Sequence, residues 1–169
     1  MSDQNLSSND YIIAACRNDQ DDILIDLLKL KNHDINFADG AGNTAAHHAY
    51  VMLFYFVQQI ERYNSISIFN IRNRAMFGSL ACLEILAHQG SINMNKKNIA
   101  TGDTPLHQAV QYTDEPDIAL AMVDVLLQAS ADPRLKNKND QTPIMLVDPK
   151  DEDMLDLLKQ AIAGYEMVI

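Results

Sequence analysis

The sequence predicts an all-α fold in which about four helix-turn-helix repeats, joined by hairpin loops, stack into a solenoid. Two observations predict this architecture. A motif of glycine or aspartate followed two residues later by threonine recurs at residues 42–44, 102–104 and 140–142. Four segments also carry apolar residues at helical i, i+3, i+4 spacing, each after a shorter candidate helix. The 169 residues are 47% hydrophobic, which suits one domain with a buried core.

The four apolar segments are the candidate second helices of the repeats. In each segment the apolar side chains fall on one face of a helix, which can therefore pack against its neighbours. The stripes are formed by Ile23, Leu24, Leu27 and Leu28; by Leu83, Ile85 and Leu86; by Met122, Val123, Leu126 and Leu127; and by Met154, Leu155, Leu157 and Leu158.

The copy of the motif at residues 102–110 predicts the start of a first helix. Thr104 stands at the helix cap, where its hydroxyl can accept a backbone N–H that lacks a partner within the helix. Pro105 falls at the first helical position, where its missing N–H costs nothing. Leu106 and Ala109 then face the neighbouring repeat, and the small alanine lets two helices approach closely.

The other two copies keep part of this pattern. Thr142 and Pro143 repeat the cap and the first helical residue, but Met145 stands where the stronger copy has His107. Thr44 keeps the cap, and alanine replaces the proline after it. The motif is therefore strongest in the middle of the chain.

Three stretches, GNTAAHHAY, GDTPLHQAVQY and LLQASADPRLKNKNDQTPIMLV, resemble small fungal ankyrin-repeat proteins. The resemblance covers residues 41–158 once an insert and a loop are set aside, and it rests most on Thr-Pro-Leu-His. It implies the ankyrin-repeat fold, and it implies that His107 hydrogen-bonds the backbone between adjacent repeats. His47 is assigned to the same signature.

We expect a single domain over residues 1–169 with atypical end repeats. Asn9 or Asp10 is expected to cap the first helix, and Gly164 to end the last one. The expected repeats are residues 8–38, 39–98, 99–136 and 137–163, followed by a tail at 164–169.

An insert at residues 51–75 interrupts the second repeat. Thr44 and Thr104 are 60 residues apart, which is 27 too many for one repeat of 33 and six too few for two. Three interpretations stay open. The insert extends a helix and packs on the stack; it is an exposed apolar element that docks a partner; or it is an intron read through in frame, which makes it an artefact of the gene model.

Composition argues against several classes of function. The formal charge of −10 disfavours nucleic-acid binding, because binding nucleic acid requires positive charge to neutralise phosphates. We expect no membrane-spanning helix, because the longest apolar run is about half the necessary length. The N-terminus does not resemble a targeting segment, so we expect a cytoplasmic or nuclear protein. Cys16 and Cys82 are expected to be reduced core residues.

No residue pattern predicts catalysis, a cofactor or a metal site. The adjacent His47 and His48 point about 100 degrees apart on a helix, and no carboxylate or cysteine stands at zinc-site spacing. Neither a phosphate-binding loop nor a nucleophile motif is present. We therefore expect no enzymatic activity, no cofactor and no bound metal.

The ankyrin resemblance implies that a partner protein binds the hairpin tips and the exposed face of the first helices. We single out Tyr112, because aromatic residues dominate interface energetics. The full set of expected contact residues is Asn43, His48, Thr101, Asp103, Gln108, Gln111, Tyr112, Lys138, Asn139 and Gln141.

The leading functional hypothesis is a monomeric protein-binding module, acting as an adaptor or a regulatory subunit. One alternative is an acidic chaperone or inhibitor for a basic client, motivated by the negative charge. A second is a structural protein that self-associates through the insert. A third, a cryptic enzyme, has no support in the sequence.

Overall fold

The computed structural model describes residues 7–18, 20–30, 32–49, 80–113 and 116–166. These residues belong to two compact units, Met1–Ile92 and Asn93–Ile169. They form helices and loops and contain no β-strand, only an isolated antiparallel bridge between Ala38 and Thr44. The predicted all-α class is confirmed. The insert at 51–75 lies outside the described residues, and the predicted repeat boundaries stay predictions.

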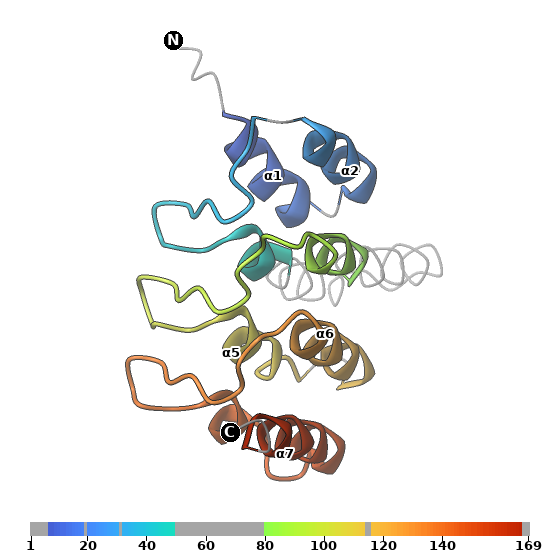
Figure 1. The fold of residues 1–169 in the computed structure, drawn as a ribbon. Coiled ribbons are helices and arrows are strands. Elements are labelled where there is room, and N and C mark those ends of the chain that lie inside the picture. Colours follow the sequence, from blue (N-terminus) through green and yellow to red (C-terminus); the bar gives the residue numbers. More distant parts are fainter. Residues whose placement is uncertain (1–6, 19, 31, 50–79, 114–115, 167–169) are drawn as a thin grey trace, which may run out of the picture. The chain divides into compact units, whose positions relative to one another are not determined.

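In the first unit, α1 (Ser8–Arg17) and α2 (Asp21–Lys29) form a helix pair (Figure 1). The cap of α1 is Ser7, not Asn9 or Asp10 as we expected. Asp10 instead completes a capping box, because its carboxylate accepts hydrogen bonds from the backbone N–H (2.9 Å) and the hydroxyl (2.7 Å) of Ser7. These bonds hold the pKa of Asp10 below its usual range.

Further helical residues in this unit are 45–49 and 80–87. The predicted apolar stripes supply its core, with Leu24, Leu83 and Leu86 almost fully buried. Cys16 and Cys82 are buried and free. One stripe residue is an exception, because Ile23 is 47% exposed on the outer side of α2.

In the second unit, α5 (Pro105–Ala109) pairs with α6 (Pro116–Gln128). After them, η1 (Pro143–Leu146), a single turn of 3-10 helix, pairs with α7 (Glu152–Glu166). The predicted stripes again form the core, which is lined by Met122, Val123, Leu126, Met154 and Leu158.

Gly164 does not end the last helix as predicted, because α7 continues through it to Glu166. The following residue accounts for the continuation. The Tyr165 hydroxyl donates to the Ala131 carbonyl (3.5 Å), and the Arg134 guanidinium lies 4.5 Å from the centre of the Tyr165 ring. These contacts offset the cost of glycine within a helix.

Two asparagines at equivalent positions join successive turns of chain within each unit. The Asn36 amide donates to the Ser91 carbonyl (2.8 Å) in the first unit, and the Asn95 amide donates to the Ser130 carbonyl (3.1 Å) in the second. The Asn95 side chain also accepts from the backbone N–H of Asp132 (2.7 Å). At this position an asparagine side chain therefore links neighbouring loops.

Candidate protein-binding surface

The start of α5 is built around a buried pair, Thr104 and His107. The backbone N–H of Thr104 donates to Nδ1 of His107 (3.2 Å), and the Thr104 hydroxyl lies 2.8 Å from the same nitrogen. On the other side of the ring, Nε2 lies 3.0 Å from the Gln141 carbonyl, which can only accept. His107 is therefore the neutral tautomer with its proton on Nε2. Burial is the main reason that its pKa lies below the usual range.

The Thr44 and His47 pair repeats this arrangement in the first unit. The backbone N–H of Thr44 donates to Nδ1 of His47 (3.1 Å), and both residues are buried. In contrast, Thr142 is followed three residues later by Met145, which has no ring nitrogen and is 63% exposed. The third copy of the motif therefore starts only the single turn η1.

Each hairpin turn is closed by one side-chain oxygen near its start. Asp39 Oδ1 accepts from the backbone N–H groups of Ala41 and Asn43 (2.9 and 3.0 Å). Asn98 and Asn137 supply the equivalent oxygen in the two later turns. Because aspartate and asparagine both serve, the turn requires the oxygen and not its charge.

In the second unit, two neighbouring hairpins, residues 97–103 and 136–141, are bonded directly to each other. The backbone N–H of Lys138 donates to the Thr101 carbonyl (2.9 Å), and its ammonium group donates to the carbonyls of Ile99 and Ala100. Lys97 donates in turn to the Lys136 carbonyl (2.5 Å). The two hairpin tips therefore form one fixed surface.

Gly102 permits this close approach. Its φ of +73° is rarely adopted by residues with a side chain, and a Cβ there would lie 2.9 Å from Cγ and 3.0 Å from N of Lys138. Gly42 (φ 79°) and Asp140 (φ 59°) adopt a similar backbone conformation in their own turns.

The comparisons with known proteins agree with this geometry. Residues 101–138 match the family model described as ankyrin repeat. The chain is 38% identical over 95 residues to a curated protein of Saccharomyces cerevisiae, "Ankyrin repeat-containing protein YGL242C". The alignment covers 55% of this chain and 51% of that protein, so the chain spans about half the length of its relative.

Residues 101–138 are an ankyrin repeat, and the chain resembles a fungal ankyrin-repeat protein. The predicted family and fold class are confirmed, and the bond from Nε2 of His107 to the Gln141 carbonyl is the backbone contact that the resemblance implied. Ankyrin repeats generally mediate protein–protein interaction, which makes the exposed residues of the joined hairpins the candidate binding surface.

Most of the expected contact residues are accessible. Thr101, Gln111, Lys138 and Asn139 are exposed, and Asn43, Gln108 and Gln141 are half-buried. The repeat-structural residues are instead withdrawn from solvent. Those that are buried are Thr44, His47, Thr104, Pro105, Leu106, His107, Ala109 and Pro143, whereas Thr142 is half-buried.

The expectation that Tyr112 is an exposed contact is wrong, because only 3% of the residue is exposed. The helix α5 ends at Ala109, and the backbone N–H of Tyr112 donates back to the Ala109 carbonyl (3.2 Å). This tight turn places the ring in the interior. Tyr112 is a core residue.

His48 and Asp103 are also buried, at 5% and 8% exposure, which corrects their predicted exposure. Nε2 of His48 donates to Oδ2 of Asp39 (2.8 Å), and the Arg17 guanidinium lies 3.7 Å from the same oxygen. Asp103 accepts from the Asn137 amide (2.9 Å). These side chains bind neighbouring loops instead of a partner.

Burial lowers the pKa of His48, and the nearby Arg17 lowers it further, while the hydrogen bond to Asp39 opposes both. Burial also acts on Asp39, where it raises the pKa of the carboxyl. The hydrogen bonds from His48, Asn43 and Ala41 outweigh it, so the pKa of Asp39 lies below its usual range.

Sequence reasoning missed Ile99, which is 63% exposed at a hairpin tip. Its signal was an apolar residue inside a polar turn, directly after the turn-closing Asn98. Because Ile99 lies on the joined hairpins, its side chain is a further candidate contact residue of this surface.

In the part of the chain that the structure describes, no helix is long and apolar enough to cross a membrane. No group of three or more histidine, cysteine, aspartate or glutamate side chains there is placed to hold a metal ion.

Proposed function

We propose that this chain is a non-catalytic protein-binding module, an adaptor or regulatory subunit, whose partner contacts the hairpin tips at 97–103 and 136–141 and the accessible glutamines Gln108, in α5, and Gln111, just after it. The observation that carries the proposal is the direct bonding between the two hairpins, which fixes Ile99, Thr101 and Asn139 on one surface. A surface that is already ordered loses little conformational entropy when a partner binds.

The chemistry of this surface favours recognition by shape and hydrogen bonding. Lys138 directs its ammonium group at the Ile99 and Ala100 carbonyls and presents mainly its aliphatic stem. The charged groups of the two other lysines are also engaged within the hairpins, because Lys97 donates to the Lys136 carbonyl and the Lys136 ammonium lies 4.0 Å from Asp140. The other exposed tip groups include an isoleucine, a hydroxyl and an amide. We therefore expect the complex to withstand high salt, since salt screens mainly exposed charge pairs.

The test is affinity capture of the tagged full-length protein from cells of its source, at low and high salt, with identification by mass spectrometry. Ile99→Ser is compared with Ile23→Ser, which removes a similarly exposed isoleucine from α2. We expect one stoichiometric partner that survives high salt, is kept by Ile23→Ser and is lost by Ile99→Ser. Equal capture by both variants would contradict the proposed surface.

The alternative function as an acidic chaperone or inhibitor for a basic client is favoured by the net charge of −10. It predicts a set of basic proteins that are lost at high salt. The other alternative, self-association through residues 51–75, predicts a mass above that of the monomer in light scattering of the full chain. We propose a monomer that acts in the cytoplasm, the nucleus or both.

A further inference from the structure

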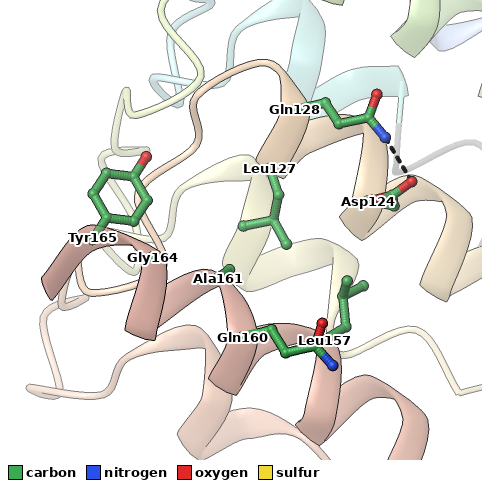
Figure 2. A pocket seen from close by; sticks show the side chains of 8 residues that line it. All are labelled: Asp124, Leu127, Gln128, Leu157, Gln160, Ala161, Gly164 and Tyr165. Carbon is green, nitrogen blue, oxygen red and sulfur yellow. Dashed lines mark hydrogen bonds between the residues drawn. The ribbon is translucent and has the colours of Figure 1, made fainter. Parts of the chain in front are cut away.

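A groove runs between α6 and α7 in the second unit, away from the hairpin tips. At its apolar end it has a volume of about 510 Å³. Figure 2 shows Leu127 of α6 facing Leu157 and Ala161 of α7 there, with Tyr165 at the far end. Leu127, Leu157, Ala161 and Tyr165 are all half-buried, so each presents part of its side chain to the groove.

The other end of the groove is acidic. It is lined by four aspartates, Asp117 and Asp124 of α6 and Asp153 and Asp156 of α7. Leu157 and Gln160 line both ends, which makes the groove continuous. All four aspartates are exposed.

The groove has the length of a short helix. The starts of α6 and α7 line the acidic end and their last turns line the apolar end, so the two helices run in the same direction. Asp153 and Tyr165 are twelve positions apart on α7, which at a rise of 1.5 Å per residue is about 18 Å or about three turns.

The charge of the two helices is one-sided. Together they carry six acidic residues and a single lysine, Lys159. Lys159 lies 3.0 Å from Asp156 and neutralises it in part, and Asp124 accepts from the Gln128 amide (2.7 Å). Asp117 and Asp153 stand in the first turns of their helices.

We propose that this groove docks an amphipathic helical segment of a partner protein, with apolar residues along one face and lysine or arginine at one end. The apolar end accepts aliphatic or aromatic side chains at i, i+4 spacing, and the aspartates pair with the cationic end. The site is separate from the proposed hairpin-tip surface, and it stands or falls independently of that proposal.

The chain contains no tryptophan, which gives a direct probe. The probe is a synthetic helical peptide of about 14 residues, enough for the groove at 1.5 Å per residue. It carries a tryptophan and two leucines at i, i+4 and i+8 and three lysines at one end. All tryptophan fluorescence then comes from the peptide, and we expect it to shift to shorter wavelength on binding to the full-length protein.

Charge is tested with matched variants of the protein. Asp117→Asn/Asp124→Asn/Asp153→Asn removes three groove carboxylates, whereas Asp21→Asn/Asp22→Asn/Asp26→Asn removes three carboxylates from α2. We expect the groove variant to weaken binding about tenfold and the α2 variant to stay within about twofold of wild type. Lys159→Gln frees Asp156 and is expected to tighten binding, a gain that damage to the fold would not produce.

Three outcomes would overturn the proposal. The first is no spectral shift with the basic peptide, or an equal shift with a peptide in which glutamates replace the lysines. The second is equal weakening by the groove and α2 variants. The third is a dimer in sedimentation equilibrium that dissociates only in the groove variant, which would assign the groove to a second copy of this chain. The variant Ile99→Ser separates the two surfaces. We expect it to lose the partner of the hairpin tips and to bind the groove peptide as tightly as wild type does.

Discussion

Replacing Gly102 by alanine tests whether the two hairpins of the second unit depend on one missing side chain. The φ of +73° would be strained for alanine by about 1 kcal/mol. A Cβ would also lie 3.0 Å from the backbone N of Lys138, which donates to the Thr101 carbonyl. The loop at Lys138 would have to move, which weakens its hydrogen bond to Thr101, worth about 1 kcal/mol. The expected loss in free energy of unfolding is therefore about 2 kcal/mol.

The assay is equilibrium unfolding in urea, followed by circular dichroism of the helices. The matched control is Gly40→Ala, because Gly40 lies in the equivalent loop of the first unit, has no positive φ and has nothing within 4 Å of a built Cβ. That variant should stay within about 0.5 kcal/mol of wild type. If Gly102→Ala unfolds at the same urea concentration as Gly40→Ala, the hairpin contact does not stabilise the fold and the reasoning fails.

Three further outcomes are expected. Ser130→Gly should raise the melting temperature, with a gain of about 0.5–1 kcal/mol, because Ser130 adopts a φ of 67° that glycine reaches without strain; an unchanged or lower value in calorimetry would contradict this. Burial lowers the pKa of His107 in the folded protein, so as the pH falls the unfolded chain binds a proton first, near pH 6.5. The free energy of unfolding should therefore fall as the pH drops below about 6.5, and it should level off below the pKa of the folded state. Urea midpoints of wild type and His107→Asn across this range check it, and the variant should show the smaller slope. Asp39→Ala should cost about 1–2 kcal/mol through two lost turn hydrogen bonds, whereas Asp39→Asn keeps the turn oxygen and should lower the pKa of His48 in an NMR titration.

The local chemistry of the helix starts was predictable from the sequence. Thr104 and Pro105 specify a helix start within four residues, and His107 completes it three positions later. The apolar stripes of the second helices were predictable for the same reason, since a 3.6-residue period reports on one helix at a time. Both signals are short-range and need no knowledge of neighbouring loops.

The sequence did not allow us to predict which polar and aromatic side chains between the helices point into the core and which point to solvent. Tyr112 turns inward because the backbone folds back on Ala109, and His48 is covered by Asp39 and Arg17, which lie 9 and 31 residues away. A residue at a variable position of a repeat can thus be a core residue of this particular chain. The groove between α6 and α7 was missed because its residues come from two helices about 36 residues apart, and no single stretch contains both sides.

Met145 stands in the position that His107 occupies in the preceding repeat. This difference affects the order in which parts of the second unit unfold locally. The histidine ties its own helix start to the next hairpin, so those two parts should exchange their amide hydrogens together. Met145 cannot form this bond, and η1 is held by the hydrogen bond from the Met145 N–H to the Thr142 carbonyl (3.0 Å) and by packing against α5 and α7. Hydrogen exchange should therefore show η1 opening first and on its own, with the protection of α5 decaying only when the whole unit unfolds.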